Sequence, residues 1–137
     1  GGQMVATNNK GVGKLLQALR HGEVVGILPD QVPPASGGEF APFFGIPALT
    51  MTLAIRLQQK TGARFVLAYA RREEESAGFR MVFRAPPNDI YAEHMPEALA
   101  AMNKSIGLLI NESPEQYQWG YKRFKRLPRG YPDAYSQ

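Results

Sequence analysis

The chain contains no cysteine among its 137 residues. That absence excludes disulfide bonds, thiolate zinc sites, iron–sulfur clusters and a cysteine nucleophile. Histidine is scarce as well, because only His21 and His94 are present, and they form no His-Glu-x-x-His metal motif. No serine lies in a Gly-x-Ser-x-Gly elbow or a Ser-x-x-Lys pair. The residues therefore favour neither nucleophilic nor metal-assisted catalysis within this chain, and no cofactor is expected.

Long hydrophobic runs are missing too. A spanning helix needs a window of about 18 apolar residues, and the sequence has none. The longest uncharged stretch, residues 40–55, contains Pro42, Gly45 and Pro47 and cannot form one continuous helix. A signal-peptide pattern is also absent. Because the sequence opens with Gly1-Gly2-Gln3 instead of an initiator Met, we expect a fragment of a longer protein.

The composition is otherwise that of an ordinary globular domain. Hydrophobic residues make up 44% and charged residues 20%, which indicates one domain over residues 1–137 with a real core. Lys and Arg number 16 against 12 Asp and Glu, so the net charge is +4. This balance favours anionic partners such as phosphates, nucleic acid, anionic lipid or an acidic protein.

The apolar pattern changes between helical and strand periods along the chain. In chain order it predicts a helix over 12–21, a buried strand over 23–28, a long loop over 30–47, a helix over 49–61, a buried strand over 64–71, a polar turn over 73–78, a strand over 79–83 and a helix over 96–110. This order favours an α/β fold, a mixed sheet flanked by helices with right-handed crossovers and some parallel pairing.

Two short motifs could bind a ligand. The stretch Gly11-Val12-Gly13-Lys14 could cradle a phosphate, although a flexible helix entry is the better interpretation because the third Gly and the Ser or Thr of phosphate loops are missing. Asp30, followed by Gln31, stands where a predicted strand ends, and open α/β sheets bind ligands beyond the carboxyl ends of strands. Alternatively, Asp30 fixes its own turn through an Asx hydrogen bond.

Two aromatic segments have several interpretations each. The loop over 40–47 contains Phe43 and Phe44 and either folds back on the core, touches a membrane or lines an acyl channel. The segment over 120–129 interleaves aromatic rings with the cations Lys122, Arg123, Lys125, Arg126 and Arg129 and contains no acidic residue. Such a pattern suits a lipid headgroup interface or single-stranded nucleic acid, and it is also compatible with a solvated tail.

Taken together, these segments resemble the lipid A biosynthesis acyltransferases, the late lauroyl or myristoyl transferases of Gram-negative bacteria. The resemblance covers nearly the whole chain in the right order. It rests on residues 19–31, Gly38-Glu39-Phe40, residues 43–48, Thr50, Asn103-Lys104, Ile110, the run Pro114-Glu115-Gln116-Tyr117-Gln118-Trp119 and the run Lys122-Arg123-Phe124-Lys125.

The resemblance implies an enzyme of lipopolysaccharide biosynthesis at the cytoplasmic face of the inner membrane. Such an enzyme moves a fatty acyl group from acyl carrier protein to a hydroxyl of a phosphorylated lipid A precursor. The family shares the glycerophosphate acyltransferase fold, in which a His with an acidic residue five positions later acts as general base. Here Gly26 follows His21 at that spacing and Leu99 follows His94. The dyad is therefore expected upstream, in a part that also carries the membrane helix.

The chain is accordingly expected to be the C-terminal portion of an acyltransferase domain, truncated on its N-terminal side, soluble and inactive by itself. A truncated sheet exposes edges and apolar surface. The resemblance implies that Asp30 and Gln31 border the acceptor site and that Phe43 and Phe44 face lipid or the acyl groove. Lys122, Arg123, Lys125 and Arg126 would bind lipid phosphates or the acidic surface of acyl carrier protein.

The alternative hypothesis is a non-catalytic basic module that binds an anionic membrane surface or nucleic acid. It accounts for the net charge, the basic aromatic segment and the missing catalyst, but it gives no role to the Asp30 loop. For an acyltransferase, an anionic membrane surface is an expected partner and nucleic acid is not.

Overall fold

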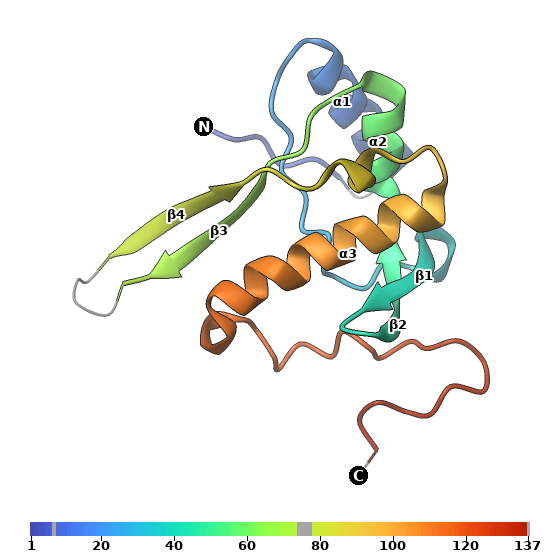
Figure 1. The fold of residues 1–137 in the computed structure, drawn as a ribbon. Coiled ribbons are helices and arrows are strands. Elements are labelled where there is room, and N and C mark those ends of the chain that lie inside the picture. The colour runs from blue at the N-terminus through green and yellow to red at the C-terminus, as the bar shows by residue number, and fades with distance from the viewer. Residues whose placement is uncertain (7, 74–77, 137) are drawn as a thin grey trace.

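The computed structural model describes residues 1–6, 8–73 and 78–136. Its main elements are helix α1 (Asn9–Arg20), strands β1 (Gly38–Phe43) and β2 (Ile46–Met51), helix α2 (Leu53–Thr61), strands β3 (Leu67–Arg72) and β4 (Phe79–Arg84), and helix α3 (Met95–Glu112). Short 3-10 helices are η1 (Ala35–Gly37), η2 (Asn88–Tyr91) and η3 (Pro114–Gln116). Figure 1 shows α3 crossing the middle of the molecule, with the β1–β2 hairpin beside it and the β3–β4 hairpin projecting from the body.

Helix α3 organises the hydrophobic core. The expected helix is confirmed, with Pro96 in its first turn, where a missing N–H costs nothing, and Pro114 just beyond its end. Its buried face packs against β1, β2, α2 and η2, and each buried aliphatic side chain contributes about 2 kcal/mol. The core residues include Phe43, Ala48, Ile55, Ile90, Ala98, Leu99, Met102, Ile106 and Ile110.

Helix α1 also follows the predicted pattern. The Asn8 side chain caps it by accepting a hydrogen bond from the Gly11 N–H at 3.1 Å. The Val12 N–H bonds to the Asn8 carbonyl at 3.0 Å, so these amides are already used within the helix. A Cβ at Gly11 would overlap the Ala6 carbonyl. Gly11 is thus present for close packing, which favours the helix-entry interpretation over a phosphate loop.

The prediction of a loop over 30–47 is wrong, because from Gly38 onward these residues form a β-hairpin. Phe44 and Gly45, between β1 and β2, have φ angles of 49° and 78°. Positive φ at both central residues is typical of the type I′ turn, whose twist matches that of the flanking strands. Helix α2 consequently begins at Leu53, and Leu49, expected on the helix, is buried in β2.

The prolines of this hairpin stand where the ladder tolerates them. Phe43 pairs with Ile46 next to the turn, and Pro42 lies opposite Pro47 in the following pair. In an antiparallel ladder, hydrogen-bonded and non-hydrogen-bonded pairs alternate, so the pair after the turn-closing one needs no N–H. Both prolines therefore fit without the loss of a ladder hydrogen bond.

The sheet topology differs from the expected mixed sheet. The architecture is a small α/β arrangement, but among the described residues the strands form two separate antiparallel pairs, β1–β2 and β3–β4. The expectation of parallel pairing within this chain is therefore wrong. The predicted strands over 64–71 and 79–83 are present as β3 and β4, which pair as an antiparallel hairpin with Leu67 opposite Arg84. Strand β3 is alternately half-buried and exposed, so the expectation that it is fully buried is wrong. Most of the predicted turn over 73–78 lies outside the described residues.

The predicted buried strand over 23–28 is also wrong. The segment belongs to no sheet, and Val24 is 96% exposed while Leu28 is 66% exposed. The physical reason is that no strand of the described chain lies beside it to pair with its backbone. In the described ranges, none of the helices has the length and apolarity needed to cross a bilayer.

Candidate functional site

The Asp30 loop is held by the aromatic residues that follow η3. The Tyr117 hydroxyl donates a hydrogen bond to Asp30 Oδ2 at 3.2 Å. Two residues beyond Asp30, the Val32 N–H donates to the Tyr121 hydroxyl oxygen at 2.8 Å. The hydrogen-bond partner of the Asp30 side chain is thus a distant tyrosine and not the backbone of its own turn. Two motifs that are far apart in the sequence meet at one place.

The Tyr117 phenol stays protonated at this junction. Its burial, the negative charge of Asp30 and the hydrogen bond to Asp30 raise the pKa of Tyr117 to about 12, although the positive charge of Arg123 opposes the shift. A phenol with such a pKa remains a hydrogen-bond donor at every physiological pH. The Asp30 carboxylate is therefore held in place by a constant donor.

The raised pKa of Tyr117 predicts that the stability of the chain falls at alkaline pH. The pKa of Tyr117 is raised from 10.0 to about 12 on folding, so its stabilising contribution is complete below pH 10 and is lost as the pH rises through 12. After allowance for partial solvent screening, we expect an extra loss of about 1 kcal/mol for the native chain relative to the Tyr117→Phe variant across this range. Urea unfolding at a series of pH values measures it, with Tyr131→Phe as the exposed control. Parallel curves for native chain and Tyr117→Phe would contradict the assignment.

Arg123 is part of the core, which corrects the expectation that it binds a surface phosphate. It is 3% exposed. Its Nη1 donates to the Leu49 carbonyl at 2.7 Å and its Nη2 donates to Thr50 Oγ1 at 3.0 Å. The guanidinium carbon lies 5.4 Å from the centroid of the Phe43 ring. Burial lowers the pKa of Arg123, while Tyr117 and Asp30 act in the opposite direction. Arg123 therefore fastens the C-terminal segment to strand β2.

Thr50 is the centre of a buried polar cluster with Arg123 and Asn103. Its hydroxyl accepts from Asn103 Nδ2 at 2.9 Å and donates to the Ala48 carbonyl at 2.9 Å. Asn103 Nδ2 also lies 3.4 Å from the Ala41 carbonyl. No motif in the sequence predicts this cluster. The available signal is the presence of Thr50 and Asn103 within otherwise apolar stretches, together with their place in the family resemblance.

The two phenylalanines at the hairpin turn have different environments. Phe43 is 2% exposed and belongs to the core, so the expectation that it faces lipid is not supported. Phe44 is 48% exposed, and its ring centroid lies 6.2 Å from that of Trp119, which is 58% exposed. Trp119 is oriented by a hydrogen bond from its Nε1 to the Pro114 carbonyl at 2.7 Å. Phe44 and Trp119 form an exposed aromatic pair.

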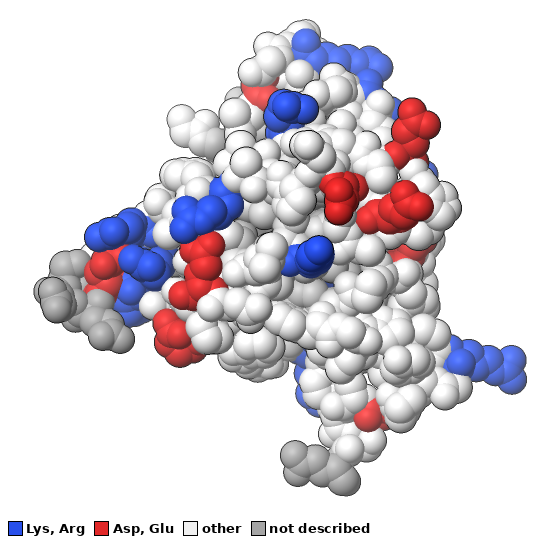
Figure 2. All heavy atoms as spheres, in the orientation of Figure 1, with Lys and Arg blue, Asp and Glu red and all other residues white. Residues whose placement is uncertain are grey.

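Lys122, Lys125 and Arg126 are exposed, unlike Arg123. The Lys122 ammonium lies 5.5 Å from the Tyr135 ring centroid and the Lys125 ammonium lies 5.2 Å from that of Tyr121. Gln31 is exposed beside Asp30. In the view of Figure 2, charged side chains gather over the β3–β4 hairpin and at the α1 end, while the largest uncharged area lies between α3 and the β1–β2 hairpin.

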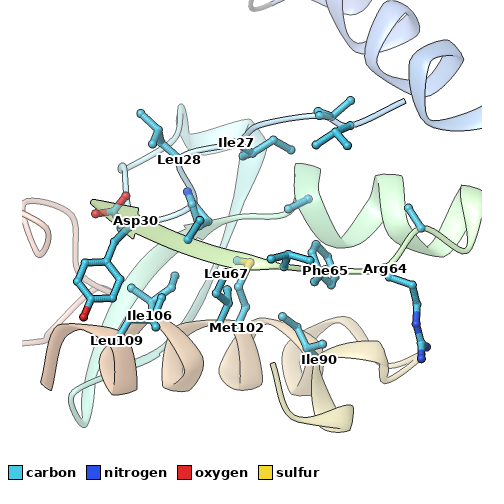
Figure 3. A pocket seen from close by; sticks show the side chains of 18 of the residues that line it. Ile27, Leu28, Asp30, Arg64, Phe65, Leu67, Ile90, Met102, Ile106 and Leu109 are labelled. Atoms are coloured by element: carbon cyan, nitrogen blue, oxygen red, sulfur yellow. The ribbon is translucent and has the colours of Figure 1, made fainter. Parts of the chain in front are cut away.

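A cavity of about 660 Å³ begins beside Asp30. Figure 3 shows Asp30 at one end of it and Arg64 at the other, with mostly apolar side chains between them. Labelled lining residues are Ile27, Leu28, Phe65, Leu67, Ile90, Met102, Ile106 and Leu109. In the part of the chain that the structure describes, no cluster of three His, Asp or Glu side chains could hold a metal ion.

Residues 1–126 match the family model of the bacterial lipid A biosynthesis acyltransferases. The chain is 34% identical over 133 residues to the lipid A biosynthesis palmitoleoyltransferase of Escherichia coli (strain K12), which covers 96% of the chain and 42% of that protein. It is 32% identical over 122 residues to the lauroyltransferase of the same organism, with 88% of the chain and 40% of that protein covered.

The resemblance inferred from the motifs is thereby confirmed, and the chain belongs to the bacterial lipid A biosynthesis acyltransferase family. It is also 26% identical over 137 residues to the Escherichia coli myristoyltransferase, which covers 100% of the chain and 42% of that protein. The chain thus spans about two fifths of the length of the curated relatives it matches.

Proposed function

We propose that the full-length protein transfers a fatty acyl group from acyl carrier protein to a hydroxyl of a lipid A precursor. The acceptor oxygen attacks the thioester carbonyl, an ester forms, and the thiol of the carrier leaves with a proton. The His and acid pair that activates the hydroxyl lies outside these residues, so this chain alone is inactive. Family membership and the names of the relatives support the reaction class.

The observation that carries the proposal for this chain is the tethered Asp30 loop. The Tyr117 and Val32 hydrogen bonds fix a half-buried carboxylate at the mouth of a cavity, beside the exposed Gln31 amide. A carboxylate there can accept a hydrogen bond from a sugar hydroxyl or orient a cationic group of the site. In this proposal Asp30 and Gln31 border the acceptor site.

The exposed cations and the aromatic pair suit the anionic, amphipathic character of these substrates. Lys122, Lys125 and Arg126 would meet the phosphates of the lipid or acidic groups of the carrier protein. Phe44 and Trp119 would lie at a headgroup interface, where aromatic rings concentrate. In this proposal the full-length enzyme acts at the cytoplasmic face of the inner membrane. Residues 1–137 would be the C-terminal part of one domain with a glycerophosphate-acyltransferase-like fold.

A charge-reversal experiment on the full-length enzyme tests the role of the cations. The variant Lys122→Glu, Lys125→Glu, Arg126→Glu is expected to raise KM about tenfold for one anionic substrate and to flatten its salt dependence. Arg123 is left intact because it belongs to the core. The control reverses the exposed Lys10 and Lys14 of α1 and should leave KM unchanged. Equal KM and salt dependence in both variants would make the segment structural only.

A further inference from the structure

The cavity beside Asp30 has two walls built from extended chain. One wall is the segment over 23–30, which precedes the Asp30 loop, and the other is strand β3 with the residues before it, 63–66. Helix α3 and the 3-10 helix η2 close it from one side with Ile90, Met102 and Ile106. The two walls are separated by the cavity and share no strand pairing.

Both walls have the side-chain alternation of a β-strand. In the first, Ile27 is half-buried while its neighbour Leu28 is 66% exposed. In the second, Phe65 and Leu67 are half-buried and Val66 between them is 66% exposed. A period of two is typical of strands, and apolar residues on both faces are typical of parallel strands that are buried on both sides.

The two walls also run in the same direction. In Figure 3 the order Ile27, Leu28, Asp30 and the order Arg64, Phe65, Leu67 both lead toward the Asp30 end of the cavity. Within the described ranges, the backbone of residues 24–31 makes no hydrogen bond, and β3 pairs with β4 along one edge only. Strand-like backbone with apolar neighbours is rarely left without partners in a native protein.

We propose that the cavity is the seat of a further β-strand, supplied by the part of the full-length protein outside these 137 residues. The strand pairs with residues 24–28 on one side and with residues 65–70 on the other, and joins both walls into one sheet. An acyl chain would fill the apolar space but leave the backbone groups of both walls unpaired. Relatives more than twice as long as the matched region have ample polypeptide to supply the strand.

This strand addition has a consequence for the site. If the added strand runs parallel to its neighbours, its carboxyl end lies beside Asp30, where open α/β sheets place their ligand sites. Residues that follow the strand would then face the tethered carboxylate. The inference goes beyond the acyl-transfer proposal and does not depend on it, because backbone pairing is measured without substrate or turnover.

Hydrogen exchange on the full-length protein tests the inference directly. Amides of residues 24–28 are expected to exchange at least ~10³-fold more slowly than unstructured amides, as in a central strand. In parallel, a single cysteine is introduced by Val24→Cys, with Leu108→Cys on the exposed side of α3 as the matched control and cysteines outside this region replaced by serine. The thiol at position 24 should react at least ~10-fold more slowly than the thiol at 108.

Each outcome decides for or against the added strand. Slow exchange and slow labelling that are independent of protein concentration support it. Protection that appears only as the protein dimerises would assign the cavity to a second copy. Slow labelling that requires added acylated lipid, with freely exchanging amides, would assign it to a lipid chain. Rapid exchange and rapid labelling under all conditions would mean that the cavity stays open, and each of these last three results overturns the proposal.

Discussion

Replacing Arg123 by alanine is expected to lower the free energy of unfolding by about 3 kcal/mol. The substitution removes two hydrogen bonds that the guanidinium donates, one to the buried Leu49 carbonyl and one to Thr50 Oγ1. An unsatisfied buried polar group costs about 1–3 kcal/mol, and hydrogen bonds from charged groups lie at the upper end. The ring of Phe43 also loses the guanidinium packed near its face. Urea unfolding of native and variant chains measures the difference.

Two further variants separate the hydrogen bonds of Arg123 from its charge. Arg123→Lys keeps the charge but cannot reach both acceptors with a planar fork, so it should recover less than half of the loss. Lys125→Ala is the matched control, because it removes an exposed neighbouring cation and should change stability by less than about 0.5 kcal/mol. A loss for Arg123→Ala no larger than that for Lys125→Ala would contradict the core assignment.

The helices could be predicted from sequence because their signals are local. Both α1 and α3 have an apolar stripe at helical spacing, and Gly22 marks the end of α1 while Pro96 and Pro114 mark the two ends of α3. The start of α1 at Asn9, capped by Asn8, lies three residues before the predicted one. Strands β3 and β4 could also be predicted from local signals, because a polar turn separates two short runs of strand-forming residues. Local patterns of this kind need no knowledge of the rest of the fold.

The β1–β2 hairpin was missed because its prolines and glycine are ordinary loop signals. Their tolerance depends on register, since Pro42 faces Pro47 in a pair that needs no N–H. Register cannot be read before the turn is known, and the turn requires positive φ at Phe44, a residue that rarely adopts it. The sequence therefore suggested a loop where the packing of the hairpin on α3 fixes two strands.

The segment over 23–28 was predicted as a buried strand on sound composition. Its continuous run of apolar, β-branched residues is typical of a buried strand, and in the structure its side chains alternate in burial but its backbone has no strand partner. A strand is stabilised by neighbours, and the neighbours of this one are absent from the described chain. The strand prediction fails because the described chain has no strand that pairs with this segment. The added-strand proposal supplies that pairing strand.

Only part of the candidate site could be predicted from the sequence. Asp30 was found because a carboxylate follows an apolar run, a local signal. The sequence could not show that Arg123 is buried while its basic neighbours are exposed. The burial of Arg123 depends on its contacts with Leu49 and Thr50, more than 70 residues away. Charge patterns identify a basic segment, but only tertiary contacts decide which of its cations remain available for an anionic ligand.

In the full-length enzyme, Asp30→Ala is expected to lower kcat/KM for acyl transfer about 100-fold while the protein still folds. Loss of a charged hydrogen-bond acceptor from the reacting complex corresponds to about 3 kcal/mol. The side chain is half-buried at a loop, so its removal should cost stability through the Tyr117 hydrogen bond and the lost attraction to Arg123. Initial rates with acyl carrier protein as donor measure the effect, and thermal unfolding checks the fold.

Tyr117→Phe and Asp30→Asn distinguish a carboxylate that acts on substrate from one that merely anchors its loop. Tyr117→Phe breaks the tether but keeps the charge, whereas Asp30→Asn keeps an acceptor for Tyr117 but removes the charge. If the charge serves the acceptor site, Asp30→Asn loses nearly as much activity as Asp30→Ala, and Tyr117→Phe retains most of its activity. If Asp30 only anchors the loop, Asp30→Asn is close to native and Tyr117→Phe is as impaired as Asp30→Ala. Unchanged turnover in all three variants would remove Asp30 from the site altogether.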